Sequence, residues 1–551
     1  MAHGPYDPDP TSKPLANPHE HRPVAEGRPQ PERPLVPLMA QVFNGRSVAD
    51  PGNPRRRRGF WIAAIALIAL VTAMQQVNVI KVLLPGKAEP AKQAAGAEGT
   101  DKPKPIEPLG ADLDQADNAG RQMVKLVHAV EGKEREKLAR DMAQFVNPGD
   151  QPQIDNAVRI VPAYAELAGR ENALKEIDRL RTQVAGTEDL SEEEKAVLSA
   201  DLDALSRLYT VGSEALSAGD RERIEERLGW QGRLALTFDV PDTDPQRAEM
   251  VANGIPLVLF LALVGLGLVL LVPVGLGMCI WASVLIGTGR LRPRMDRPLA
   301  GGSIGIEVVV VFLAGFAGLR LLMELVALAA DQGWLGAALK SAPDGTLVPI
   351  TLVLQWLILP MVVFYPRLRA YPRWRVNRAL GWHRGEGFIR EMAAGVAGYL
   401  ASLPLYVVGA ALALLLGMLE HFIIRQITGT DPPGPVNPIA GLLAESWWIA
   451  LLVAALATVW APIVEELVFR GAMFRQLYAR MGVIAAALLS GTVFAMMHGY
   501  SPSLFPPLIV LGTCFAVIRW WRGSLVATVT AHALHNGTLM IIMLVLFSLL
   551  K

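Results

Sequence analysis

Cysteine is scarce in this sequence. Its 551 residues include two, Cys279 and Cys514, and both lie in apolar runs. The long polar stretch in the middle of the chain has none, so its fold cannot depend on disulfide bonds. No C-x-x-C pair occurs either, which excludes the metal sites that are built on that motif.

Charge is missing from long parts of the chain. Charged residues gather in 1–58 and 85–250, whereas the rest consists mainly of apolar runs. Hydrophobic residues make up 52% of the sequence, and the net charge is +1. This distribution favours a membrane protein with soluble parts over a soluble globule. No basic patch is interleaved with aromatic residues, so nucleic acid is not expected as a partner.

The N-terminal part predicts a tail followed by an anchor. Residues 1–58 are rich in proline and poor in apolar residues, which predicts a disordered tail because nothing can form a core. The cluster Arg55–Arg58 precedes an apolar helix over 59–84. We expect an uncleaved signal-anchor there, because the tail is long and no clear small-x-small cleavage site follows. The positive-inside rule then keeps the N-terminus in the cytoplasm.

Residues 85–250 are polar, charged and mostly helical in pattern. The stretch "SEEEKAVLSADLDALSRLY" begins with Ser191 and Glu194 as a capping box and continues with apolar residues at helical spacing. We therefore expect a small helical domain on the extracytoplasmic side. It shows no catalytic constellation, and binding of a partner is a candidate role for it.

The remaining chain alternates apolar runs with polar loops. Additional transmembrane helices are expected over 251–392, and a further set over 393–551. The loops 289–298 and 367–391 carry four and seven arginines, whereas 330–346 and 419–446 are poor in Lys and Arg. With the tail inside, every arginine-rich loop is also inside. The individual runs lie near 255–288, 303–329, 347–366, 393–418, 447–466, 483–499, 503–518 and 524–550.

These patterns together predict an all-α fold. It is a polytopic membrane helix bundle of about nine spans, with a disordered tail and a helical extracytoplasmic domain. The run 255–288 contains Pro273 and is expected to form one long helix. Two spans there would place the later arginine-rich loops on the side opposite to the N-terminal tail. The protein is expected to lie in the cell membrane as a multi-pass protein, and its anchor and tail are of a kind common in bacterial inner membranes.

Ionisable residues are rare in the last four spans. Such residues usually face the interior of a helix bundle and are functional candidates by default. They are Glu465, Glu466, Arg470, His498, His532 and His535, with Asn536 beside them.

The spacing of these residues predicts how they pair. Glu466 and Arg470 are four apart with the acid first, the favourable order for a helical ion pair. Glu465 is rotated by about 100° and has no partner in its own helix. The expected turn at 479–483 lies about equally far from Glu465 and His498, so a hairpin would place these two at the same height. His532 and Asn536 are also four apart and share one helix face.

A glutamate near histidines in a low-dielectric cavity can take a proton from water, and histidine or asparagine can bind a metal or stabilise an oxyanion. This combination suggests hydrolysis of a peptide bond in or near the membrane. The alternative is a non-catalytic scaffold, or a transporter that relays protons through the same buried groups. A transporter of the common type would show repeated halves, and no repeat is visible.

Three motifs resemble those of a known family. The stretches "EELVFRG" (465–471), "FAMMH" (494–498) and "HALHN" (532–536) resemble the EExxxR, FxxxH and HxxxN motifs of the CAAX-protease and bacteriocin-processing (CPBP) intramembrane proteases. The resemblance covers roughly 393–550. It implies a bundle of membrane helices with a cavity open to the cytoplasmic side. It also implies an endopeptidase that acts on a peptide or protein substrate, without implying a CAAX substrate.

The resemblance implies a role for each motif residue. Glu465 corresponds to the general base, His498 and His532 to the catalytic histidines, and Asn536 to a group that helps hold the oxyanion. Glu466 and Arg470 correspond to supporting positions.

The resemblance leaves both a metal-dependent and a metal-free mechanism open. If zinc is present, His498 and His532 are its candidate ligands. His535 lies outside the motif pattern and is expected to be a packing residue.

Overall fold

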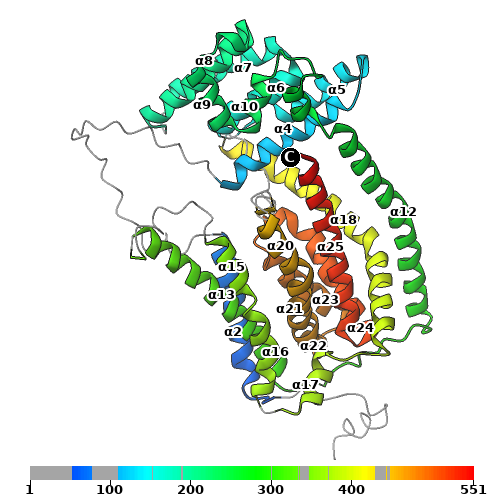
Figure 1. Cartoon of the computed structure of the whole chain (residues 1–551). Helices are drawn as coiled ribbons and strands as arrows, with labels where there is room; N and C mark the ends of the chain where they lie inside the picture. Colours follow the sequence, from blue (N-terminus) through cyan, green and yellow to red (C-terminus); the bar gives the residue numbers. More distant parts are fainter. Residues whose placement is uncertain are drawn as a thin grey trace, which may run out of the picture. The chain divides into compact units, whose positions relative to one another are not determined.

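Every regular element that the structure describes is a helix, as the sequence predicts. Figure 1 shows these helices in the computed structural model. The predicted tail up to residue 51 and the segment 77–109 lie outside the described residues. The described ranges are 52–76, 110–151, 153–187, 190–299, 301–332, 334–335, 347–369, 371–428, 442–443 and 447–550.

Eight helices within these ranges are long and apolar enough to cross a membrane, and Val483–Met496 is a shorter apolar helix. The chain is therefore a multi-pass membrane protein, in agreement with the expected number of about nine. The elements are α2 (Arg57–Gln76), α12 (Gly254–Gly287), α13 (Ile304–Asp331), α15 (Val348–Gln355) with α16 (Ile358–Leu368), α18 (Phe388–Thr428), the stretch from α20 (Trp447–Ala455) to α22 (Phe474–Tyr478), α23 (Val483–Met496), α24 (Phe505–Arg522) and α25 (Leu525–Leu550). A short helix, α17 (Arg373–Leu380), lies between α16 and α18.

Two span boundaries differ from the prediction. The helical stretch that starts at Trp447 continues to Tyr478 instead of ending near residue 466, and α18 extends well beyond 393–418 at both ends. Hydropathy marks the apolar part of a helix, whereas backbone hydrogen bonding continues into its polar ends. The run around Pro273 is one continuous helix, α12, as expected.

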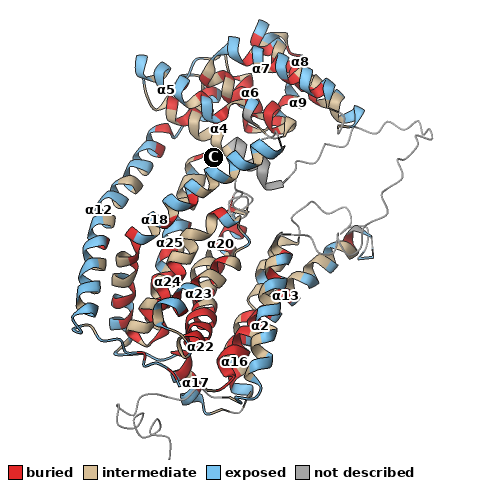
Figure 2. Ribbon diagram, turned by 180° about the vertical axis from the view of Figure 1, so that it is seen from behind, coloured by how far each residue is buried: buried red, intermediate tan, exposed pale blue. Residues whose placement is uncertain are grey.

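The helices between 110 and 251 pack around two apolar clusters, and α6 contributes to both. Figure 2 shows how buried residues concentrate on α6. The predicted capping box starts α8: the Glu194 backbone N–H donates to Ser191 Oγ at 3.2 Å, and the Ser191 N–H donates to Glu194 Oε2 at 2.8 Å. The elements are α4 (Gly110–His128), α5 (Lys133–Ala143), α6 (Ile154–Ala168), α7 (Arg170–Gly186), α8 (Glu192–Val211), α9 (Ala218–Leu228), α10 (Trp230–Leu236) and α11 (Pro245–Val251).

A buried charge cluster joins α4, α6 and α11. Glu166 of α6 accepts hydrogen bonds from His128 Nε2, at 2.8 Å, and from Arg247. Arg247 Nε also donates to Asp242 Oδ1 at 3.2 Å. Burial alone would raise the pKa of the Glu166 carboxyl, but the hydrogen bonds from His128 and Arg247 hold this pKa below its ordinary value of 4.5. The ionised form of Glu166 therefore stabilises the folded domain.

Glu166→Gln should lower the stability of this domain by about 1–3 kcal/mol at neutral pH. Because the folded pKa is depressed, the contribution of Glu166 is complete above pH 4.5 and is lost as the pH falls through the lower, folded value. Native-state hydrogen exchange of α6 in the full chain should show a lower free energy of opening in Glu166→Gln than in the wild type. This difference should become smaller as the pH falls. Asp242→Asn is the control, because that side chain is 42% exposed and its loss should matter less. A difference in the free energy of opening that does not change with pH would contradict the prediction.

Candidate active site

The first motif lies in a helix whose hydrogen bonding switches from the α to the π pattern at two places. Between α20 and α22, two π-helical stretches, η4 (Leu456–Trp460) and η5 (Glu466–Met473), flank the single α-helical turn α21 (Ala461–Glu465). π-turns are rare and often occur at functional sites. Here one of them begins between the two adjacent glutamates.

Glu466 is fully buried and accepts hydrogen bonds from two side chains. Its Oε1 accepts from Arg470 Nη1 at 2.7 Å, which is the ion pair that the four-residue spacing predicts. The same oxygen accepts from His532 Nδ1 at 2.9 Å. Glu466 therefore joins the first motif to the third through a contact that the sequence does not reveal.

Arg470 is also fully buried, and three aromatic rings surround its guanidinium. Its Cζ lies 4.4 Å from the ring centroid of Phe494, 5.3 Å from that of Phe515 and 5.9 Å from that of Phe469. Cation–π attraction and one carboxylate thus hold a charge that would be costly alone in a membrane. Its complete burial among side chains of other helices fits a supporting residue.

Glu465 differs from its neighbour in being partly exposed and in making no ion pair as short as those of Glu466. Its side chain is 17% exposed, and Oε2 lies 3.8 Å from His532 Nε2. That oxygen has no hydrogen-bond partner in the described part of the chain. Oε2 of Glu466 also has no hydrogen-bond partner among the described residues, but that side chain is fully buried, so Glu465 is the acid that water can reach more easily.

His498 follows the last turn of α23. Its Nδ1 donates to the Phe494 carbonyl at 2.8 Å, because a carbonyl can only accept, and this leaves Nε2 for another partner. The ring lies edge-on to Phe494 and nearly parallel to Tyr500. The Glu465 carboxylate is close enough to act electrostatically on His498 and Tyr500. This agrees with the predicted equal height of Glu465 and His498.

The third motif lies on α25. The ring of His532 stacks on Phe515 at 5.1 Å. Asn536 Nδ2 donates to the Ala457 carbonyl, in the π-helical stretch η4, at 2.7 Å. His532 and Asn536 therefore contact the same helix, as residues on one face should. His535 packs between the rings of Tyr399 and Tyr406, as expected of a packing residue.

A pair of glycines brings α23 and α24 together beside Arg470. A Cβ on Gly512 would lie 2.7 Å from the Cα of Gly491 and 3.2 Å from Arg470 Nη2. The two helices can approach this closely, and the guanidinium can fit beside them, because neither position carries a side chain. Neither these glycines nor Tyr500 can be singled out from the sequence, since no spacing rule distinguishes them from other loop or helix residues.

The described residues contain no group of three or more His, Cys, Asp and Glu side chains placed to hold a metal ion. The bonds of Nδ1 to Phe494 O in His498 and to Glu466 in His532 leave Nε2 of each ring, but no third ligand is grouped with these two atoms in the described residues. The side chains as placed do not fit a three-ligand zinc site.

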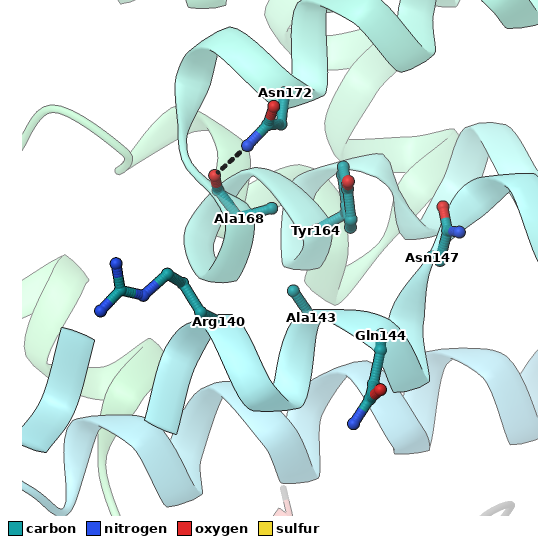
Figure 3. Close-up of a pocket in the computed structure, with 7 residues that line it drawn as sticks. All are labelled: Arg140, Ala143, Gln144, Asn147, Tyr164, Ala168 and Asn172. Atoms are coloured by element: carbon teal, nitrogen blue, oxygen red, sulfur yellow. Dashed lines mark hydrogen bonds between the residues drawn. The ribbon is translucent and has the colours of Figure 1, made fainter. Parts of the chain in front are cut away.

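A separate hollow of about 340 Å³ lies in the polar helical region and is unrelated to the motif residues. Figure 3 shows its lining, in which Asn172 Nδ2 donates to the Ala168 carbonyl at 2.9 Å. No acid lines this hollow, so it lacks a pair of groups for acid–base catalysis. Its lining residues are Arg140, Ala143, Gln144, Asn147, Tyr164, Ala168 and Asn172.

Comparisons with known proteins place the motifs in a family. Residues 446–538 match the family model described as Type II CAAX prenyl endopeptidase Rce1-like. The chain is also similar to the membrane-embedded CAAX protease MroQ of Staphylococcus aureus (strain USA300), with 24% identity over 148 residues. The aligned part is 26% of this chain and spans 58% of that relative's length. No solved structure matches. The resemblance read from the three motifs is thus confirmed: residues 446–538 form an Rce1-like (CPBP) domain, similar to that of CAAX prenyl endopeptidases.

Proposed function

We propose that this chain hydrolyses a peptide bond in or near the membrane, and that Glu465 takes the proton of the attacking water. The observation that carries this proposal is the contrast between the two acids. Glu466 is fully buried and its Oε1 is bonded to Arg470 and His532, whereas Glu465 is 17% exposed and its Oε2 lies 3.8 Å from His532 Nε2. A general base must lie within reach of water and substrate, and the partly exposed Glu465 meets this condition better than the fully buried Glu466.

Glu466 supports the chemistry by orienting His532. Its carboxylate accepts the Nδ1–H bond, which fixes the ring and leaves Nε2 toward Glu465. A proton on Nε2 of His532 would let that histidine donate to the oxyanion.

Asn536 supplies a further donor. One N–H of its amide is bonded to Ala457 O, and the other is available for the same oxyanion. In the proposed reaction the water oxygen bonds to the carbonyl carbon, Glu465 holds the released proton, and this proton passes to the amine as the C–N bond breaks.

Cleavage of a peptide library by the purified full chain tests this function. We expect cleavage that is lost in Glu465→Gln and that survives a chelator, since the described residues offer no group of three metal ligands. Loss of cleavage on chelation, with recovery on adding zinc, would instead assign His498 and His532 to a metal site. Failure of the wild-type chain to cut any library member would favour the scaffold or transporter alternative.

The substrate class that we propose is a peptide or protein that reaches Glu465 from the membrane or its surface. MroQ is named a CAAX protease, but no residue of the site described here requires a prenylated terminus. A binding partner of the 85–250 region stays a separate proposal.

We further propose that the N-terminus and the turn at 479–482 between α22 and α23 face the cytoplasm. The arginines at 55–58 and in the loops 289–298 and 367–391 support this orientation. Protease added to intact cells should digest the 85–250 region and spare a tag at the N-terminus. Permeabilised cells, in which both should be digested, provide the control. Digestion of the tag alone in intact cells would reverse the orientation.

A further inference from the structure

The loop that carries His498 is bonded to two helices outside the family-matched segment. On one side, Gln75 Nε2 of α2 donates to the Met497 carbonyl at 2.6 Å. On the other side, Ser501 Oγ lies 3.0 Å from both carboxylate oxygens of Glu420 in α18. The five residues 497–501 are therefore fixed from both sides, with His498 between the two attachments.

The Met497 carbonyl needs a donor from elsewhere. Met497 is the C-cap of α23, and the last carbonyls of a helix have no N–H donor within that helix. Gly499 adopts a φ of 69°, which turns the chain out of the helix and removes the next backbone N–H groups. An unbonded carbonyl is costly where water is scarce, and the amide of Gln75 satisfies this one.

Helix α2 is itself held in place. Near its C-terminal end, Val71 and Met74 form an apolar cluster with Ala317 of α13, and Met497 packs against that cluster. Just before its N-terminal end, the Asn53 backbone N–H donates to Ser303 Oγ at 3.0 Å. Gln75 therefore extends from a docked helix and can hold the loop rather than follow it.

We propose that Gln75 is a positioning residue for His498, and that the anchor helix α2 thereby contributes to catalysis. This inference rests on the function proposed for His498. The Gln75 bond fixes the carbonyl directly before His498, in the same turn as the bond from His498 Nδ1 to Phe494 O. Without the Gln75 amide, the last turn of α23 loosens and His498 Nε2 moves away from the Glu465 side of the site.

Kinetics of three variants test the proposal. Gln75→Leu keeps the volume but removes the donor, and should lower kcat by about 10–100-fold with little change in KM. Thr72→Val is the matched control, because Thr72 Oγ1 donates to Ile68 O within the same helix, and its kcat should equal that of the wild type. The kcat of Gln75→Glu, relative to that of the wild type at the same pH, should rise as the pH falls, because a protonated carboxyl can donate to Met497 O and a carboxylate cannot. A role limited to helix packing would not produce this pH dependence.

Hydrogen exchange of residues 497–501 in the full chain supplies a readout that needs no substrate. Exchange should be faster in Gln75→Leu than in the wild type and unchanged in Thr72→Val. Equal exchange in all three proteins, or an unchanged kcat in Gln75→Leu while Glu465→Gln is inactive, overturns the inference and leaves the proposed function standing. Exchange that is faster in Gln75→Leu, together with a wild type that cuts no substrate, would support the loop attachment. It would contradict the proposed function, and with it the role of Gln75 in catalysis.

Discussion

Glu465→Gln is expected to lower the rate of cleavage by about 10²–10⁴-fold, the usual effect of losing a general base. The amide has the size of the carboxylate but cannot take a proton from water. Because Glu465 makes no ion pair as short as that of Glu466 with Arg470, its neutralisation should leave folding and membrane insertion unchanged. Initial rates on a substrate that the wild type cuts, together with thermal unfolding in detergent, measure the two effects separately.

Glu466→Gln is the control one residue away. It should reduce stability more and chemistry less, since it weakens the contacts to Arg470 and His532 without removing the base. His498→Ala and His532→Ala should inactivate the enzyme whichever role these histidines have. Wild-type cleavage by Glu465→Gln would show that the base is assigned to the wrong acid.

The local part of this site could be predicted from the sequence. The four-residue spacing of Glu466 and Arg470 predicts their ion pair, and the 100° rotation separates Glu465 from it. The turn at 479–483 predicts that Glu465 and His498 lie at the same height. These inferences succeed because helix geometry alone relates the residues.

Contacts between helices could not be predicted in this way. The bond from His532 to Glu466 joins residues 66 apart, and that from Gln75 to Met497 joins residues 422 apart. The bond from Gln75 ends on a main-chain carbonyl, so the residue types Gln and Met do not indicate it in the sequence. The π-helical stretches also depend on tertiary contacts, as the bond from Asn536 to Ala457 O in η4 illustrates.

The spans themselves were predicted from hydropathy, but not the lengths of the helices. The apolar part of α18 was recognised, whereas its ends at Phe388 and Thr428 lie in polar sequence that carries no hydropathy signal. The helical domain was recognised from the cap at Ser191, because a side chain that satisfies its own helix end is a local feature.

Arg470→Ala should have the largest effect on stability, about 3–5 kcal/mol, because it breaks a fully buried ion pair. It leaves the Glu466 carboxylate with His532 as its remaining hydrogen-bond donor among the described residues, and it empties the space beside the rings of Phe494 and Phe515. Thermal unfolding and the yield of folded protein measure the loss, and activity should fall with them.

Two further variants separate the lost charge partner from the lost side chain. Arg320→Ala breaks another pair at the same four-residue spacing, Arg320 with Glu324 at 3.2 Å, but that arginine is 37% exposed and the cost should be below about 1 kcal/mol. Adding Glu466→Gln to Arg470→Ala removes the stranded carboxylate and should recover part of the stability, though not the part lost to the empty space. If Arg470→Ala instead melts like the wild type and is inactive, Arg470 takes part in the chemistry, and the surrounding phenylalanines serve to exclude water from a reacting group rather than to hold a structural charge.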